Sequence, residues 1–275
     1  MKVRILTALA IALVGIPILI FCHTIAFPIA VSVVSVRAIF EILRVIGADK
    51  NKYVALPSYV MALGLPFGAY FSVNGIMTYV SVLAVTLFIF LLYLFAFAIF
   101  TKGSLKFGEI SEIFASVTYV TSSLSAMCAL AHASGGIYTL ILVFIGAWVC
   151  DIAAYFVGVS IGKHKLIPEI SPKKTVEGAI GGIVFTAIGF VLYGVIVASL
   201  TDFRANYVML FITGIIIPIV SQLGDLVASL IKREHNVKDY GNILPGHGGV
   251  LDRFDSVIPV SMVLLIISEN FPAFL

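Results

Sequence analysis

The segment from Ser229 to Asp255 concentrates residue types that could bind a polyphosphate. Its Pro245-Gly246-His247-Gly248-Gly249 run carries few bulky side chains, so backbone N–H groups there can approach an anion closely. Arginine and lysine side chains on either side of that run can neutralise phosphate charge. The segment therefore predicts an anion site, with its cations at Lys232, Arg233, Lys238 and Arg253.

Two carboxylates follow the glycine run and could hold a metal ion beside that anion. Asp252 and Asp255 lie three residues apart, a spacing that puts both side chains on one face of a helix. Mg²⁺ usually takes one or two carboxylates together with phosphate oxygens of a substrate. In the alternative interpretation, the two aspartates only cap the helix and interact with its positive N-terminal end.

Two further aspartates occur inside strongly apolar segments. Asp225 ends the stretch Ser221-Gln222-Leu223-Gly224-Asp225, and Asp151 follows Trp148-Val149-Cys150. An ionised carboxylate in hydrocarbon is costly unless it is paired or coordinated. We therefore interpret Asp225 as a functional residue. For Asp151, a hydrogen bond between two helices is an open alternative.

A second basic stretch, Ser171-Pro172-Lys173-Lys174-Thr175, precedes another apolar segment. Pro172 ends any preceding helix, whereas Thr175 and Glu177 favour a helix start. Two lysines beside the positive N-terminal end of a helix are unfavourable unless an anion binds there. A phosphate-bearing substrate would resolve that conflict. The alternative is that the lysines only fix the orientation of the chain in a membrane.

These residues belong to a chain of 275 residues that is 61% hydrophobic and 11% charged. Soluble domains carry about 25% charged residues, so a globular protein of this composition would lack polar surface. A helix that crosses about 30 Å of hydrocarbon needs roughly 20 apolar residues. The sequence therefore predicts an all-α, polytopic integral membrane protein with about nine spans, near residues 4–21, 25–46, 53–72, 76–100, 109–133, 136–160, 176–200, 207–231 and 254–273.

The distribution of lysine and arginine predicts the orientation of these spans. With nine spans, the N-terminus and the loops after the even-numbered spans share one side of the membrane. That side holds 15 of the 17 lysines and arginines, and the two exceptions are Arg37 and Arg204. Because cytoplasmic loops are enriched in these residues, we expect a cytoplasmic N-terminus and cytoplasmic long loops at about 161–175 and 232–253.

Several other features narrow the choice of function. The chain has no Walker A, GxSxG, HExxH or dinucleotide-binding motif, which excludes the familiar ATPases, serine hydrolases and zinc proteases. Its net charge of +3 is too small to indicate a nucleic-acid partner. Cys22, Cys128 and Cys150 are scattered without the spacing of metal ligands. Arg37, Glu41 and Arg44 follow i, i+4, i+7 spacing and predict an ion-pair ladder within the second span.

The run from Ser229 to Asp255 resembles the signature of the phosphatidate cytidylyltransferases, also called CDP-diacylglycerol synthases. The stretch from Ser171 to Gly178 and the element Gln222-Leu223-Gly224-Asp225 are similar to the same family, although Val176 stands where the family often has an aromatic residue. The resemblance covers about the C-terminal half, and the length is similar to the compact bacterial form. The matching positions of the run are Ser229, Lys232, Arg233, Lys238, Asp239, Gly241, Leu244, Pro245, His247, Gly248, Gly249, Asp252, Arg253 and Asp255.

The resemblance implies a reaction in phospholipid biosynthesis, in which CTP and phosphatidic acid give CDP-diacylglycerol and pyrophosphate. It implies Mg²⁺ as the cofactor and leaves a second cation open. The metal ligands that it implies are Asp225 and Asp252, followed by Asp255 and Asp239. The phosphate-binding residues of the catalytic set would be Lys232, Arg233, Lys238 and Arg253, with His247 as a donor to a phosphate oxygen. The other substrate-binding residues would be Lys173, Lys174, Asp151, Ser171, Thr175, Glu177, Gly248 and Gly249.

We expect two regions in the chain. Residues 1–108 would form about four N-terminal spans, and residues 109–275 a catalytic transmembrane region with motif loops at 161–178 and 229–255. The expected location is the bacterial cytoplasmic membrane, and small residues at helix surfaces favour a homodimer. Two other functions stay open, namely a CTP-dependent lipid-alcohol kinase that releases CDP and a transporter that does not consume CTP.

Overall fold

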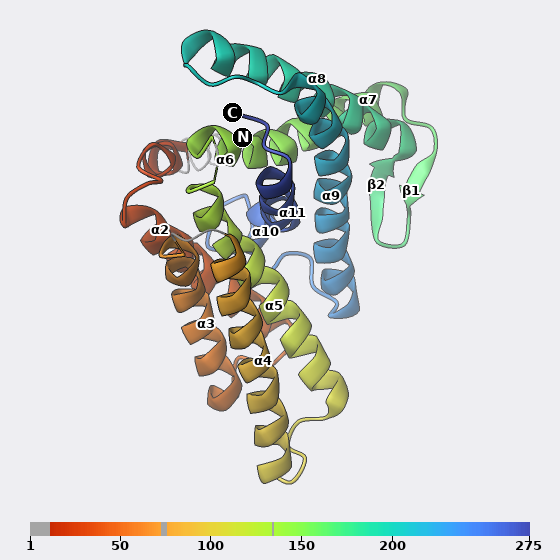
Figure 1. The fold of residues 1–275 in the computed structure, drawn as a ribbon. Coiled ribbons are helices and arrows are strands. Elements are labelled where there is room, and N and C mark those ends of the chain that lie inside the picture. The colour runs from red at the N-terminus through yellow and green to blue at the C-terminus, as the bar shows by residue number, and fades with distance from the viewer. Residues whose placement is uncertain (1–11, 73–75, 134) are drawn as a thin grey trace. The chain divides into compact units, whose positions relative to one another are not determined.

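The computed structural model describes residues 12–72, 76–133 and 135–275. This part of the chain is mostly helical, and its only strands form one short hairpin, which confirms the predicted all-α, multi-pass class (Figure 1). The start of the predicted span 4–21, with the basic residues Lys2 and Arg4, lies outside the described residues. Within the described ranges, six helical segments are long and apolar enough to cross a membrane: Ala26–Val45, Thr78–Phe100, Phe107–Leu130, Ile137–Ile161, Val176–Leu200 and Tyr207–Glu234.

Two of the predicted spans correspond to helices outside those six. The prediction at 53–72 falls on α3 (Lys52–Tyr70), which has prolines at positions 57 and 66. The prediction at 254–273 falls on α11 (Val257–Asn270), which has only 14 residues. At 1.5 Å per residue, a helix of that length is shorter than the hydrocarbon layer of about 30 Å.

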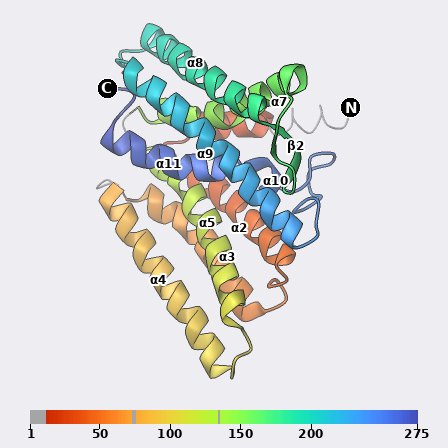
Figure 2. The ribbon, with the colours of Figure 1, turned by 90° about the vertical axis from the view of Figure 1, so that its right-hand side faces the viewer.

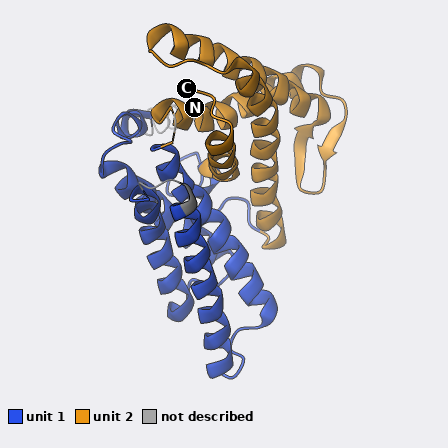
Figure 3. Cartoon of the chain, viewed as in Figure 1, with its two compact units in different colours: residues 1–132, 237–253 blue, residues 133–236, 254–275 orange. Residues whose placement is uncertain are grey.

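The chain forms two compact units, which are described separately (Figure 3). The first contains residues 1–132 and 237–253, and the second contains residues 133–236 and 254–275. This division differs from the predicted boundary after residue 108, because α5 (Phe107–Leu130) packs against α2 (Ala26–Val45) and α3. The predicted motif loop 229–255 contributes residues to both units.

The first unit is built from α2, α3, α4 (Ile76–Phe100) and α5, with the short α10 (Leu251–Phe254) at the end of the motif segment. Polar side chains tie these apolar helices together. The Ser32 hydroxyl of α2 donates to the Leu63 carbonyl of α3 at 2.8 Å. The Tyr79 hydroxyl of α4 donates to the Ser122 carbonyl of α5 at 2.9 Å. Within lipid, burial of apolar surface does not drive helices together, so hydrogen bonds of this kind help to stabilise their association.

The second unit contains α6 (Ile137–Phe144), α7 (Cys150–Ile161), α8 (Val176–Leu200), α9 (Tyr207–Glu234) and α11. Helix α8 packs against α7 and α9, and α9 also packs against α11 (Figure 2). Gly178 allows the close approach of α7 and α8, since a Cβ there would lie 2.6 Å from the Ala154 carbonyl oxygen. The predicted span 136–160 is interrupted by a π-helical turn, η1 (Ile145–Val149), directly before α7. Such turns often occur at functional sites.

A β-hairpin precedes α8, where the sequence analysis predicted only a loop. Strands β1 (Lys165–Ile167) and β2 (Ser171–Thr175) pair antiparallel, with Lys165 opposite Thr175. The Thr175 side chain then caps α8 by accepting the Gly178 N–H at 3.1 Å. The predicted helix start is therefore confirmed, and the two adjacent lysines of the motif lie on the strand that leads into it.

Candidate active site

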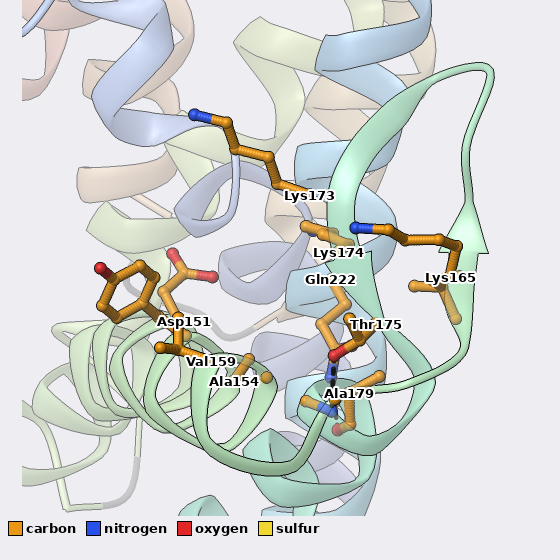
Figure 4. Close-up of a pocket in the computed structure, with 14 residues that line it drawn as sticks. Asp151, Ala154, Val159, Lys165, Lys173, Lys174, Thr175, Ala179 and Gln222 are labelled. Carbon is orange, nitrogen blue, oxygen red and sulfur yellow. Dashed lines mark hydrogen bonds between the residues drawn. The ribbon is translucent and has the colours of Figure 1, made fainter.

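A cavity of about 490 Å³ lies within the second unit, lined by the hairpin and by helices α7, α8 and α9 (Figure 4). The hairpin contributes Lys165, Lys173 and Lys174, whereas α7 contributes Asp151 together with apolar and aromatic residues such as Tyr155. In Figure 4, Lys165 projects from β1 toward β2, and Asp151 projects from α7 into the same space. A cavity with cations on one wall and apolar side chains on another suits a ligand that joins a phosphate to a hydrocarbon chain.

An ion pair joins the two motifs that contribute to this unit. The Lys174 Nζ atom, on β2, lies 2.5 Å from Oδ2 of Asp225, on α9. About a quarter of each side chain is exposed. The structure therefore brings together two residues that the sequence analysis predicted separately. The lysine also meets the requirement that a carboxylate in an apolar helix be paired.

A third carboxylate, Asp255, lies beside Asp225 in the turn before α11. Burial, and next the negative charge of Asp225, raise the pKa of Asp255 to about 7, and Asp151 contributes in the same direction. The Ser256 N–H and the Lys232 ammonium act in the opposite direction. Two carboxylates that repel each other in a partly dry site are an arrangement that a divalent cation would stabilise.

Asp151 accepts a hydrogen bond within the same unit. The Ser256 hydroxyl donates to Oδ2 of Asp151 at 3.3 Å. This bond links α7 to the start of α11, so the hydrogen-bonding alternative for Asp151 is present in the structure. Asp151 also lines the cavity and is exposed, so its carboxylate remains accessible to a ligand there.

The glycine-rich segment belongs to the first unit, and Asp252 organises it. Asp252 is buried, and its Oδ2 atom accepts the N–H groups of Tyr240 at 2.8 Å and Gly249 at 2.9 Å. Gly248 adopts a φ of +89°, and a Cβ there would lie 2.9 Å from Oδ2 of Asp252. The loop therefore needs glycine at position 248 to close around this carboxylate. Asp252 lies in the first turn of the short α10, after its first residue Leu251.

Comparison with known proteins decides among the chemistries that these sites could support. The sequence pattern described as the cytidylyltransferase family matches residues 2–271. The chain belongs to the cytidylyltransferase family. A protein named phosphatidate cytidylyltransferase from Staphylococcus haemolyticus (strain JCSC1435) is 36% identical over 274 residues, which cover 97% of this chain and 99% of the relative. Proteins of the same name from Bacillus subtilis (strain 168) and Staphylococcus aureus (strain COL) are 36% and 35% identical, over 98% and 97% of this chain and 98% and 99% of the relatives.

The four predicted metal ligands of this cytidylyltransferase are divided between its two units. Asp225 and Asp255 belong to the second unit, and Asp239 and Asp252 belong to the first. Within the ranges that the structure describes, no group of three or more histidine, cysteine, aspartate or glutamate side chains gathers in the way a metal site requires. The pair of Asp225 and Asp255 is the part of the predicted set whose electrostatics fit a divalent cation.

The other predicted residues of this cytidylyltransferase take varied positions. Arg233 donates from Nε to the Ile170 carbonyl at 3.4 Å and so holds the turn of the hairpin. Glu177 accepts a hydrogen bond from the His164 N–H and lies 2.6 Å from its Nδ1. Lys232 is buried on α9, Ser171 is half-buried on β2, and His247 is half-buried in the glycine-rich loop. The exposed members are Lys173, Arg233, Lys238, Asp239 and Arg253.

Sequence reasoning gave no role to two polar residues that line the cavity. Lys165 adds a third hairpin cation, which becomes apparent only when β1 pairs with β2. Gln222 lies one turn before Asp225 on α9, and its Nε2 donates to the Ala179 carbonyl of α8 at 3.2 Å (Figure 4). The sequence offered one signal for Gln222, namely a polar side chain within an apolar helix and next to a recognised motif.

Proposed function

We propose that this chain transfers the cytidylyl group of CTP to the phosphate of phosphatidic acid, giving CDP-diacylglycerol and pyrophosphate. The observation that carries the proposal is the cavity with three hairpin lysines and an apolar helical wall, where one of the lysines, Lys174, also pairs with Asp225. The membership of the cytidylyltransferase family and the name of its relatives support the same reaction.

The reaction requires the alignment of two anionic substrates and little covalent help from the protein. An oxygen of the lipid phosphate attacks the α-phosphorus of CTP, a new phosphorus–oxygen bond forms, and the bond to the β-phosphate oxygen breaks with release of pyrophosphate. The second pKa of a phosphate monoester is about 6, so the attacking oxygen is already largely ionised near neutral pH. Alignment and charge neutralisation are therefore the main contributions that the protein has to make.

We assign the lipid phosphate to the hairpin wall of the cavity. Lys165, Lys173 and Lys174 would neutralise that phosphate, while the apolar side chains of α7 would lie beside the acyl glycerol. Thr175 on β2 and Gln222 on α9 add hydrogen-bonding groups to the lining of the cavity. The CTP phosphates would then be held by the basic residues of the motif, Lys232, Arg233, Lys238 and Arg253, as the family resemblance implies.

Mg²⁺ is part of the proposal, with Asp225 and Asp255 of the second unit as its ligands. Asp252 and Asp239 keep the metal-binding role that the family resemblance implies. Bound at Asp225 and Asp255, the ion would reduce the repulsion between the substrate phosphates and the carboxylates. The surroundings of Asp255 support this choice, because burial and, after it, the negative charge of Asp225 raise the pKa of Asp255. A second cation remains part of the hypothesis.

The location and assembly of the protein are also proposals. The concentration of lysine and arginine on one side of the predicted spans supports a bacterial cytoplasmic membrane with the active site facing the cytoplasm. Small residues at helix surfaces support a homodimer. The mass of the protein in a detergent of known micelle size would test the assembly, and accessibility of a cysteine placed at Lys173 would test the side of the membrane.

The reaction is tested with purified protein, labelled CTP, phosphatidic acid and Mg²⁺. We expect a lipid-linked cytidine nucleotide and pyrophosphate in equal amounts. Release of CDP with a phosphorylated lipid would instead indicate a CTP-dependent lipid kinase. Substrate flux in proteoliposomes without consumption of CTP would indicate a transporter.

A further inference from the structure

Glu41 is a fully buried carboxylate on the membrane helix α2, and the proposed reaction gives it no role. Its side chain has 0% exposure. Arg37, one helical turn earlier, donates from Nε to Oε1 of Glu41 at 3.1 Å, so the predicted ladder is confirmed for this pair. A buried carboxylate in a membrane helix is costly even when it is paired once. Its other contacts therefore indicate what the charge is used for.

The second oxygen of Glu41 binds the backbone of the motif loop. Oε2 accepts the N–H of Leu251 at 2.8 Å, across 210 positions of sequence. Leu251 is the residue before Asp252 and the first residue of α10. The carboxylate thus fixes the backbone next to a predicted metal ligand.

Two glycines of the motif pack directly on the same carboxylate. A Cβ on Gly241 would lie 2.6 Å from Oε1 of Glu41, and a Cβ on Gly249 would meet Oε2 even more closely. Neither glycine has a positive φ, so close approach rather than backbone conformation requires glycine at both positions. The anion that these glycines approach in the structure is a side chain of the protein.

Two further contacts complete the support of the loop. The predicted ladder does not extend to Arg44, which donates from a guanidinium nitrogen to the Tyr240 carbonyl at 2.8 Å. The N–H of the same residue, Tyr240, donates to Oδ2 of Asp252. Helix α2 therefore binds the two ends of the loop, at Tyr240 and at Leu251, and the bond from Tyr240 to Asp252 joins those ends.

We propose that Glu41 is a positioning residue, which holds the glycine-rich loop 240–252 and through it the carboxylate of Asp252. Glu41 acts as a hydrogen-bond acceptor and as a surface for Gly241 and Gly249, and it does not touch the substrates. The effect of Glu41 on the rate of cytidylyl transfer rests on the proposed function, whereas its role in fixing the loop is independent of that function.

Hydrogen–deuterium exchange of the full-length protein tests the hold on the loop. We expect Glu41→Ala to make the amides of the 240–252 peptide exchange at least about tenfold faster, because the Leu251 N–H loses its buried acceptor. Glu41→Gln keeps a carbonyl oxygen and nearly the same volume, so exchange within about threefold of wild type is expected. Ser32→Ala is the matched control, since it removes a buried bond between α2 and α3 on the same helix without a contact to the loop.

Kinetics on the same variants test the effect on the reaction. We expect Glu41→Ala to lower kcat at least about tenfold, because Asp252, the predicted metal ligand, would no longer be held in the position that the reaction needs. Glu41→Gln should restore most of that rate, and Ser32→Ala should lower Tm without changing kcat. Unchanged loop exchange in Glu41→Ala, or a Glu41→Gln variant as impaired as Glu41→Ala, would overturn the inference. A wild-type protein without cytidylyl transfer would overturn the proposed function alone, since the exchange experiment decides the positioning role without it.

Discussion

The Lys174 ammonium lies 2.5 Å from a carboxylate oxygen of Asp225, so the protein itself neutralises a residue that we predict to bind Mg²⁺. The lysine also lines the cavity to which we assign the lipid phosphate. A lysine and a metal ion that approach the same carboxylate compete for its charge. Lys174 is therefore expected to weaken Mg²⁺ binding before the substrate arrives and to neutralise phosphate afterwards.

Replacing Lys174 with methionine should strengthen Mg²⁺ binding and weaken catalysis. Without the competing cation, the Mg²⁺ dissociation constant of the substrate-free protein should fall about threefold to tenfold, as expected for a partly exposed ion pair. The kcat should fall about tenfold or more, because a phosphate loses a neutralising group. The Mg²⁺-dependent rise in Tm measures the first effect, and initial rates measure the second.

Lys165→Met provides the control for this prediction. Lys165 lies on the same hairpin and lines the same cavity, so its loss removes the same charge. The structure shows Asp225 paired with Lys174, so Mg²⁺ affinity should change little in Lys165→Met. Mg²⁺ binding in Lys174→Met that is no tighter than in wild type would contradict the competition.

Asp252→Asn should separate the loop-closing role of this residue from its predicted metal role. The asparagine carbonyl can still accept the N–H groups of Tyr240 and Gly249, so the loop and the Tm should be preserved. The negative charge is lost, and we expect kcat to fall at least about 100-fold, the scale on which loss of an electrostatic group acts. Asp252→Ala should lower both kcat and Tm. Activity of Asp252→Asn near that of wild type would remove this residue from the metal site.

Hydropathy predicted the long helices well, because a segment of roughly 20 apolar residues that crosses the hydrocarbon layer has to be helical. The predicted spans 76–100 and 176–200 coincide with α4 and α8. The hairpin was missed because Ser171-Pro172-Lys173-Lys174-Thr175 has no alternation of apolar and polar residues that would predict a strand. Its pairing depends on β1, whose three residues are too few to give a periodic signal.

The motif residues could be named from the sequence, but their partners could not. Gly249 was predicted to approach a substrate phosphate, and the structure places it against the carboxylate of Glu41. The two residues are far apart in the chain, and their contact depends on how α2 packs. The pair of Lys174 and Asp225 was likewise predicted as two separate sites, because a single sequence carries no signal for the contact of β2 with α9.

The raised pKa of Asp255 predicts how the metal-free protein responds to pH. The ordinary value of 3.8 applies to the unfolded chain, whereas burial and the charges of Asp225 and Asp151 hold the pKa near 7 in the folded protein, against the opposing effect of Lys232. Between these two values the folded state binds more protons, so the free energy of unfolding falls as pH rises toward 7. In EDTA, wild type should therefore lose Tm between pH 5.5 and 8, and Asp255→Asn should lose less.

Mg²⁺ should reverse this trend, because its binding requires an ionised Asp255. The rise in Tm on adding Mg²⁺ to wild type should be larger at pH 8 than at pH 5.5, and Asp255→Asn should show little of that difference. Asp239→Asn, a change at an exposed aspartate of the same motif, is the control and should keep the wild-type slope in EDTA. Parallel pH slopes for wild type and Asp255→Asn would show that Asp255 does not carry the effect.

The cap of α8 should be essential to the shape of the cavity wall. Thr175 accepts the Gly178 N–H at 3.1 Å, and its hydroxyl oxygen would lie 2.9 Å from a Cβ at Gly158, on α7. Thr175→Val keeps the shape of the side chain but removes the acceptor, so the unfolding free energy should fall by about 1 kcal/mol. The displaced helix end also carries Lys174 on the adjoining strand, so KM for phosphatidic acid should rise.

Thr175→Ser should restore both properties, because serine caps a helix at least as well as threonine. Thr201→Val is the matched control at the other end of α8, where the hydroxyl donates to the Val197 carbonyl at 2.8 Å and accepts the N–H of Phe203, beyond the helix, at 3.3 Å. That variant leaves no helical N–H without an acceptor, so KM for phosphatidic acid should be unchanged. A Thr175→Ser variant that is no better than Thr175→Val in Tm and KM would show that the methyl group, and not the cap, is what this position requires.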